Sequence, residues 1–314
     1  MRGTTRRESV EVEGPWRHRY VSANGARFHI AETSADARRP LVLLLHGFPE
    51  FWWAWRDQLP ALANSGYRAV AMDLRGYGAS DKTPRGYDPV TLAADVAAVV
   101  QSLGSRRATL VGHGWGGYVA WTAATAHPEL VSRLCAVAAP HPAAMLGSPG
   151  GMYSGRLLGH LLAMQVPWFP ERAIMRGRYV GEHLRSWAGP ESGFPTPEVA
   201  ERYHQALSLW PSPHCALEYH RWLVRSRLRR DGRAFNALMS RRVALPVLHI
   251  AGAEDRAVPA RAVAACRSHV SGELHTVSLP KVGHFPHEED PGRFNRELIG
   301  WLSAGAPSGA DSGG

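Results

Sequence analysis

The feature that most constrains the fold is a run of five apolar residues, 41–45, which ends directly at His46-Gly47. A strand that is apolar throughout is typical of a parallel sheet, where both faces are buried. Similar short segments alternate along the chain with segments of helical pattern. We expect strands at 41–45, 68–73, 108–112, 130–138, 246–252 and 274–279, and helices at 52–65, 91–103, 115–127, 259–270 and 290–302. This alternation predicts an α/β protein with a doubly wound, mostly parallel sheet.

The alternation is interrupted between residues 141 and 242. This segment is rich in Trp and Arg and indicates helices without a buried strand. We therefore expect one α/β core, residues 15–140 and 243–303, with 141–242 inserted as a helical cap over the carboxyl ends of the strands, where ligands bind. Asn24-Gly25 predicts a hairpin between strands at 17–22 and 27–32. The polar residues 1–14 and the Gly/Ser/Ala-rich residues 304–314 are expected to be disordered.

The net charge of +9 is almost entirely arginine, because Lys82 and Lys281 are the only lysines. Between His141 and Arg242, 14 Arg stand against 7 acidic residues, so +7 of the charge lies in the expected cap. This segment carries no nucleic-acid-binding motif. We expect its arginines to coat exposed helices or attract an anionic substrate, with no nucleic acid as a partner. The lack of an apolar run of ~18–20 residues argues against a membrane span, and the N-terminus does not resemble a secretion signal. We therefore expect a cytoplasmic protein, as a monomer or homodimer.

The sharpest local signal is Val111-Gly-His-Gly-Trp-Gly-Gly117, at a predicted strand-to-helix junction. A G-x-nucleophile-x-G segment at such a junction is a nucleophile elbow, where small flanking residues let the chain turn sharply and present one side chain above the sheet. The flanking residues here are Gly112 and Gly116. The central residue is Gly114, which has no side chain, so the nucleophile position is vacant.

Two further candidate catalytic residues follow in the order that this architecture expects. Asp255 comes after the strand at 246–252, and His284 comes after the strand at 274–279. A carboxylate in the first place can orient an imidazole in the second, which can then act as a general base. The backbone N–H groups of Phe48 and Trp115 are candidates for an oxyanion hole.

These segments resemble the epoxide hydrolases of the α/β-hydrolase fold, which are related to the haloalkane dehalogenases. The resemblance is dense over residues 40–140 and 245–302 and weaker across the cap. It is carried by the segments His46-Gly-Phe-Pro-Glu50, Trp55-Arg56, Gln58-Leu-Pro-Ala-Leu62, Gly66-Tyr-Arg68, Ala71-Met-Asp73, Arg75-Gly-Tyr-Gly78, Gly112-His113, Trp115-Gly-Gly117 and Val282-Gly-His284.

The resemblance implies a mechanism with one missing part. In the family an elbow Asp attacks the epoxide to form an ester, and the His and a second carboxylate then activate the water that hydrolyses it. Asp255 and His284 match this pattern, whereas Gly114 replaces the nucleophile. The resemblance also implies a cap tyrosine that donates to the epoxide oxygen. Leu217-Glu-Tyr-His-Arg221 places His220 at that position and Tyr219 one residue earlier, ~100° away around a helix.

The residues leave three functions open. In the first, His284 and Asp255 activate water, or a hydroxyl of the substrate, for direct attack on an epoxide or similar electrophile, with His220 as the acid. In the second, the protein is a catalytically dead or engineered epoxide hydrolase, because Gly at the elbow relieves backbone strain. In the third, it is a ligand-binding pseudoenzyme. We favour the first, because binding alone does not require an Asp–His pair.

The expected substrate is a small apolar or aromatic molecule, with an epoxide as the leading candidate. Its expected contacts lie on the loop after the first buried strand, on the elbow and in the cap: His46, Phe51, Trp52, Trp115, Tyr219 and His220. We expect no metal and no other cofactor, because the histidines lack helical i, i+4 pairing with a carboxylate. The three widely spaced cysteines, Cys135, Cys215 and Cys266, form neither a metal motif nor a disulfide framework.

Overall fold

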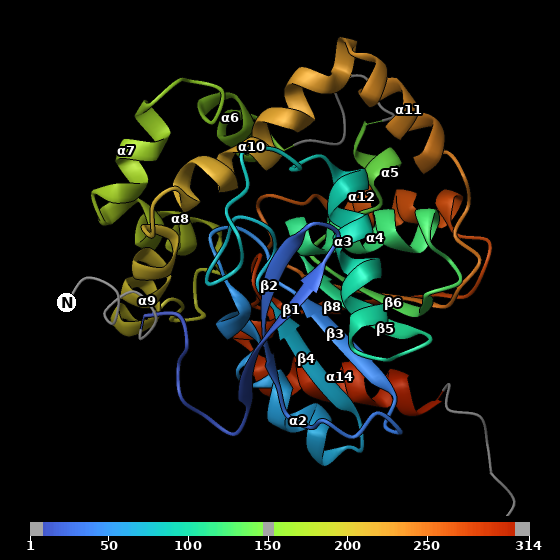
Figure 1. The fold of residues 1–314 in the computed structure, drawn as a ribbon. Coiled ribbons are helices and arrows are strands. Elements are labelled where there is room, and N and C mark those ends of the chain that lie inside the picture. Colours follow the sequence, from blue (N-terminus) through green and yellow to red (C-terminus); the bar gives the residue numbers. More distant parts are fainter. Residues whose placement is uncertain (1–8, 147–153, 305–314) are drawn as a thin grey trace, which may run out of the picture.

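A computed structural model describes residues 9–146 and 154–304 of the chain and contains one mixed sheet (Figure 1). The eight strands lie in the order β1-β2-β4-β3-β5-β6-β7-β8. They are β1 (Arg17–Ala23), β2 (Ala26–Glu32), β3 (Leu41–Leu45), β4 (Arg68–Met72), β5 (Ala108–His113), β6 (Val131–Val137), β7 (Val247–Gly252) and β8 (Leu274–Leu279). β1 and β2 form an antiparallel hairpin, β2 pairs antiparallel with β4, and every other pairing is parallel. The predicted α/β class and mostly parallel sheet are confirmed.

The apolar run that opens the sequence pattern forms the centre of this sheet. β3 lies between β4 and β5, where Leu43 pairs with Val70 on one side and Leu110 on the other. Every residue of these three strands is buried. Their continuous hydrophobicity therefore follows from helices covering both faces of the sheet.

The helices of the core cover the two faces of the sheet (Figure 1). α3 (Pro89–Ser102) and α4 (Trp115–Ala126) pack together on one face, while α2 (Gln58–Asn64) and α14 (Pro291–Ala304) pack together on the other. α3 begins where the Asp88 side chain accepts a hydrogen bond from the Thr91 N–H, with Pro89 in the first turn. Shorter helices are α12 (Ala260–Ala265) and α13 (Pro286–Glu289) in the core and α5 (Pro142–Leu146) at the start of the expected cap, with single turns η1 (Trp52–Trp55) and η3 (Cys266–His269).

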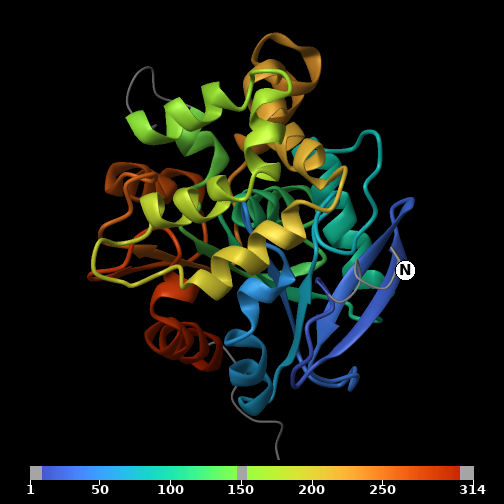
Figure 2. The same cartoon turned by 90° about the vertical axis from the view of Figure 1, so that its left-hand side faces the viewer.

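Between β6 and β7 the chain is helical, and Figures 1 and 2 show these helices gathered over one end of the sheet. After α5 they are α6 (Gly155–Ala163), α7 (Phe169–Met175), α8 (Arg178–Trp187), α9 (Pro197–Leu207), α10 (Ser212–Arg225), η2 (Ser226–Leu228) and α11 (Arg230–Met239). Polar contacts hold this layer on the core. The His284 N–H donates to the Trp187 carbonyl at 3.0 Å, and the Tyr219 hydroxyl donates to the Arg75 carbonyl at 2.7 Å.

The N-terminal segment differs from the expectation of disorder over 1–14. Val10 is buried, and its carbonyl accepts a hydrogen bond from Trp52 Nε1 at 2.6 Å. The Val12 carbonyl accepts from Trp16 Nε1 at 2.8 Å. The expectation is wrong for residues 9–14, because these two valines supply apolar contacts and backbone acceptors to core tryptophans. Ala304, expected in the tail, is the last residue of α14, whereas the expected disorder of 1–8 and 305–314 lies outside the described residues.

None of the helices within residues 9–146 and 154–304 is long and apolar enough to cross a membrane.

Candidate active site

The elbow is intact in its backbone although its central side chain is missing. β5 ends at His113, α4 begins at Trp115, and Gly114 between them has φ +51° and ψ −114°. A Cβ atom on Gly112 or Gly116 would lie 2.4 or 2.2 Å from a backbone oxygen, so these glycines permit close packing. A Cβ on Gly114 would meet nothing closer than 3.7 Å. The space above Gly114 is therefore open.

His284 faces that open space and is held by Asp255. His284 Nδ1 donates to Asp255 Oδ2 at 2.8 Å, while Asp255 Oδ1 accepts from the N–H groups of Ala257 and Val258 at 2.7 and 3.0 Å. His284 Nε2 lies 3.8 Å from the position of a Cβ on Gly114. Because an ionised carboxylate only accepts, Nδ1 carries the proton and Nε2 presents a lone pair to the open space. This arrangement suits a general base.

A fully buried cluster of Glu50, His113 and His287 lies behind His284. His113 donates from Nδ1 to Glu50 Oε2 and from Nε2 to the His284 carbonyl, both at 2.8 Å. Both partners are acceptors, so His113 is protonated. Burial would lower the pKa of His113, but the charge of Glu50 and its hydrogen bond raise it above its usual value. Burial would likewise raise the pKa of Glu50, but His113 and then His287 hold it well below its usual value.

The same cluster has the donor types of a metal site, and its Glu50–His113 half is engaged in internal hydrogen bonds, whereas Glu50 Oε1 and both ring nitrogens of His287 make none with the described residues. One donor atom each from Glu50, His113 and His287 lies within 4.8 Å of the others. However, Glu50 Oε2 already accepts from His113 and from the Gly47 N–H, and Glu50 Oε1 lies 3.2 Å from His287 Nε2. We therefore interpret the cluster as a structural support for the loop that carries His284.

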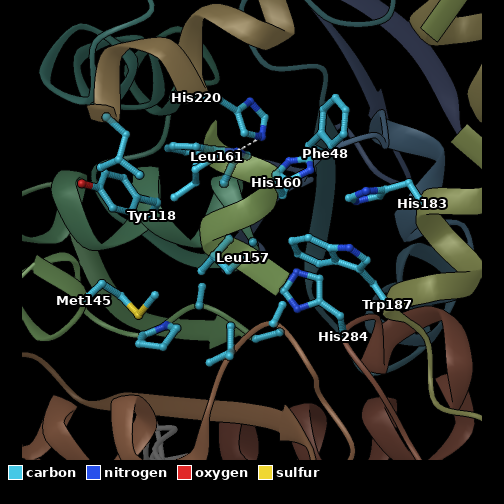
Figure 3. Close-up of a pocket in the computed structure, with 18 residues that line it drawn as sticks. Phe48, Tyr118, Met145, Leu157, His160, Leu161, His183, Trp187, His220 and His284 are labelled. Carbon is cyan, nitrogen blue, oxygen red and sulfur yellow. Dashed lines mark hydrogen bonds between the residues drawn. The ribbon is translucent and has the colours of Figure 1, made fainter. Parts of the chain in front are cut away.

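A pocket that is partly open to solvent lies between the core and the cap (Figure 3); the empty space there, counted together with the adjoining open solvent, is about 740 Å³. Most of its wall is apolar, including Met145, Leu157, Leu161, Leu223 and Val258. Its polar wall consists largely of four imidazoles: His160, His183, His220 and His284. Among the described residues that line it, none carries a carboxylate, a thiol, an aliphatic hydroxyl or a lysine amine. Within this set of residues, no other side chain has taken over the role of a covalent aspartate.

His220 lines the pocket, but both of its ring nitrogens are engaged. Nδ1 donates to the Ala216 carbonyl at 3.0 Å, and Nε2 accepts from Trp115 Nε1 at 2.9 Å (dashed in Figure 3). An indole N–H can only donate, so His220 is in the neutral Nδ1–H form. Burial lowers the pKa of His220 to about 4. The hypothesis that His220 is the acid is therefore wrong for this geometry, because no N–H remains for a substrate.

His160 and His183 are two of the pocket residues that the sequence did not predict. Their rings lie 5.0 Å apart, and Figure 3 shows both beside Phe48 and above His284. Among the described residues, the hydrogen bond to His183 is one that its backbone carbonyl accepts from the Ser186 hydroxyl, and none engages the ring nitrogens of His160 or His183. Burial lowers the pKa of His183 to about 3 and that of His160 well below its usual value, with the neighbouring histidines as further causes. The available signal was the position of His183 on the apolar face of α8, with Leu184 and Trp187.

Four expected substrate contacts are not among the residues that line the pocket: His46, Phe51, Trp52 and Tyr219. His46 is fully buried, and its Nε2 accepts from the Leu74 N–H at 3.1 Å. Trp52 is fully buried and packs towards the N-terminal segment through Trp16, with ring centroids 5.2 Å apart.

Phe51 and Tyr219 also lie in packed surroundings. The Phe51 ring packs edge-on against Tyr203 of α9, with centroids 5.8 Å apart. The Tyr219 hydroxyl is committed to the Arg75 carbonyl, so it faces the core. The expectation of substrate contact is wrong for these four side chains, because each fills space between elements and leaves no surface in the pocket.

Phe48 and Trp115 do line the pocket, beside the open space over Gly114. Trp115 is the first residue of α4, where backbone N–H groups have no partner inside the helix. In the described chain, the Phe48 N–H has no backbone acceptor. The two N–H groups predicted for an oxyanion hole thus remain available.

The order of the sheet, the elbow and the Asp–His pair together define an α/β hydrolase. A family model described as the alpha/beta hydrolase fold matches residues 40–291. The chain is 32% identical over 300 residues to epoxide hydrolase 3 from Xenopus tropicalis, a match covering 91% of this chain and 77% of the relative. It belongs to the epoxide hydrolase family of this fold.

Two further relatives show how the similarity is distributed. Over 143 residues the chain is 43% identical to epoxide hydrolase B from Mycobacterium tuberculosis, covering 44% of this chain and 40% of that protein. The solved structure of Cfl2 from Burkholderia cenocepacia matches with a TM-score of 0.77 and 30% identity, covering 91% and 95% of the two chains. The fold similarity therefore extends over a longer stretch than the segment of highest identity.

Proposed function

We propose that this protein opens an epoxide or a similar electrophile by acid/base catalysis, without a covalent intermediate on the enzyme. The main support is the pairing of His284 with Asp255 at 2.8 Å, with Nε2 facing the space that Gly114 leaves open. Loss of a CH₂–COO⁻ group leaves room there for one or two waters of ~30 Å³ each. A base beside a water site can take a proton from that water, which then attacks the epoxide directly.

In this mechanism the proton returns to the product. His284 Nε2 takes a proton from water, or from a hydroxyl of the substrate, while that oxygen attacks an epoxide carbon. The carbon–oxygen bond of the epoxide breaks, and the resulting alkoxide receives the proton that His284 has taken up. The N–H groups of Phe48 and Trp115 hold the attacking oxygen within reach of the base.

The cap supplies hydrogen-bond donors for the epoxide oxygen in place of a tyrosine. His160 and His183 fit this role, because both line the pocket and neither ring is engaged by another described residue. Their lowered pKa values keep both neutral near pH 7. Neutral imidazoles donate a hydrogen bond without opposing the positive charge that develops on His284.

The substrate that fits is a small, mainly apolar molecule. The apolar wall buries a hydrocarbon body, while the imidazoles supply the few polar contacts that fix its orientation. Relatives named as epoxide hydrolases support an epoxide as the reacting group.

The experiment compares the wild type with His284→Ala and Gly114→Asp on a panel of epoxides. We expect the wild type to be active and His284→Ala to lose at least ~10²-fold in kcat/KM. His275→Ala is the matched control, because His275 is exposed on β8 and paired with Glu273. In a single turnover in ¹⁸O-labelled water, label found first in a protein carboxylate would overturn direct attack.

Two outcomes point to the other functions. An inactive wild type together with an active Gly114→Asp variant would identify a catalytically dead epoxide hydrolase. Ligand binding that survives His284→Ala, with no turnover by any variant, would identify a binding protein.

A further inference from the structure

The space over Gly114 is bounded in a way that suits a carboxylate. Its nearest neighbours are Gly47 Cα, 3.7 Å from the position of a Cβ, and His284 Nε2, at 3.8 Å. α4 is 12 residues long, and its N-terminal cap, Gly114, has no side chain to accept from the first-turn N–H groups. Free N–H groups at a helix N-terminus favour an anion.

A second, independent feature also points to a ligand here. The His284 side chain is only 8% exposed, and its Nε2 faces the space over Gly114 without a partner in the described chain. Asp255 lies on the other side of the ring, at Nδ1, and no described lining residue carries a carboxylate. No acidic side chain among the described residues of the pocket therefore competes for the N–H groups at the start of α4, or for His284 Nε2 when that nitrogen is protonated and can donate to a carboxylate.

We propose that the substrate brings its own carboxylate to this subsite, so that an epoxy acid supplies the group that the elbow lacks. One carboxylate oxygen accepts from the N–H groups of Phe48 and Trp115, and the other faces the reacting carbon. The chemical step rests on the part of the proposed function in which an epoxide is opened without a covalent intermediate on the enzyme, whereas binding of the carboxylate does not.

The rest of the pocket accommodates the remainder of such a molecule. With the carboxylate in the subsite, the hydrocarbon part of the substrate would lie along Leu157 and Leu161. Its epoxide oxygen would face His160 and His183. An acid whose epoxide is at the γ,δ position places its own carboxylate within reach of the γ-carbon, as a five-membered ring requires.

The reaction then proceeds through a free lactone. The carboxylate binds with a protonated His284 and attacks the γ-carbon, forming a carbon–oxygen bond while the epoxide carbon–oxygen bond breaks. The alkoxide takes the proton from His284. Neutral His284 next takes a proton from water, whose oxygen attacks the lactone carbonyl. The ring oxygen leaves as a hydroxyl with that proton, so one water is consumed and a dihydroxy acid is formed.

Binding is tested by calorimetric titration with sodium acetate and, as a neutral isostere, acetamide. We expect acetate to bind the wild type at least about tenfold more tightly than acetamide. Gly114→Ala should weaken acetate binding by about tenfold or more, because its Cβ enters the subsite. Gly104→Ala is the matched control, since Gly104 also has a positive φ, +72°, and no atom near a Cβ.

Equal binding of acetate and acetamide by the wild type overturns the subsite even if Gly114→Ala does not fold. Unchanged acetate binding by a folded Gly114→Ala overturns it as well. Neither result affects the turnover of neutral epoxides, which tests the proposed function separately.

Turnover of a γ,δ-epoxy carboxylate and of its methyl ester tests the chemical step. We expect kcat/KM to be about a hundredfold higher for the acid, because charged hydrogen bonds to the two N–H groups are lost in the ester. In ¹⁸O-labelled water the lactone route places the label in the carboxyl group of the product. Label in a new hydroxyl overturns the lactone route and supports direct attack by water. Acetate binding without turnover of any epoxide supports the subsite and overturns the catalytic step.

Discussion

Histidines line the pocket on two sides, its floor on the core and its roof in the cap, but among the described residues only the floor histidine has a carboxylate partner. On the floor, His284 is held by the carboxylate of Asp255, which is itself fixed by two backbone N–H groups. On the roof, His160, His183 and His220 have no carboxylate partner among the described residues, and they lie near one another.

This difference separates their chemistry. Burial without a compensating anion lowers the pKa values of the roof histidines, to about 3 for His183 and about 4 for His220. The roof is therefore neutral near pH 7 and offers hydrogen bonds. The floor combines an oriented imidazole with the N-terminus of α4, so it can accept a proton and stabilise an anion. A partner carboxylate, more than burial, distinguishes the base from its neighbours.

The largest effect is expected from removing the charge that orients the floor histidine. Asp255→Asn should lower kcat for the best epoxide by ~10³–10⁴, because the amide favours the wrong tautomer of His284. Steady-state kinetics measures this effect, with Asp36→Asn, a partly exposed aspartate paired with Arg38, as the control. A loss below tenfold would contradict the assigned role of Asp255.

The next largest effect is expected from disrupting the buried Glu50–His113 pair behind His284. Glu50→Ala should lower the free energy of unfolding by about 3–5 kcal/mol, because it leaves protonated His113 buried without its anion. Urea denaturation compares it with Glu273→Ala, whose partner His275 is half exposed. Equal midpoints for the two variants would show that the buried pair does not stabilise the fold.

A smaller change is expected at the elbow. Gly114→Ala should cost about 1–3 kcal/mol of stability, because its φ of +51° disfavours any side chain although the space is open. Thermal unfolding with Gly104→Ala alongside separates the cost of the backbone conformation from that of the site. An unchanged melting temperature for Gly114→Ala would mean that the elbow relaxes.

The smallest effect is expected from His183. It should change the slope of the free energy of unfolding against pH. His183 has a folded pKa of about 3 against an unfolded value near 6.5, so the unfolded chain binds more protons between these values. The stability that neutral His183 supplies is therefore present above about pH 6.5 and is lost as the pH falls towards 3. The slope per such histidine is at most about 1.4 kcal/mol per pH unit.

His183→Gln should reduce this slope between pH 7 and pH 5, as measured by urea denaturation at several pH values. His275→Gln, at an exposed position, should leave it unchanged. Identical slopes for the wild type and His183→Gln would contradict a neutral, buried His183.

The sequence was most informative where a local rule determines position. The apolar run 41–45 predicted a central strand, because few other environments accept five consecutive apolar residues in so short an element. The elbow, Asp255 and His284 could be placed because each follows a strand, and the carboxyl ends of parallel strands converge. These residues do meet, at 2.8 Å for the Asp–His pair.

The rest could not be predicted because it depends on packing between distant segments. Phe51 and Trp52 follow the first buried strand, near the elbow in space, yet their rings fill gaps against α9 and the N-terminal segment. Whether a cap histidine faces the pocket depends on the rotation of its helix, and the engagement of His220 depends on Trp115, 105 residues away. Hydrophobic pattern alone carries neither fact.

The preserved backbone at Gly114 has a consequence for how this lineage can change. In the genetic code, two glycine codons become aspartate codons by a single base change. Because the turn, the neighbouring glycines and the Asp255–His284 pair are all in place, one such mutation would put a carboxylate beside a ready base and its helix terminus. A single point mutation would then separate covalent from non-covalent chemistry on the same fold.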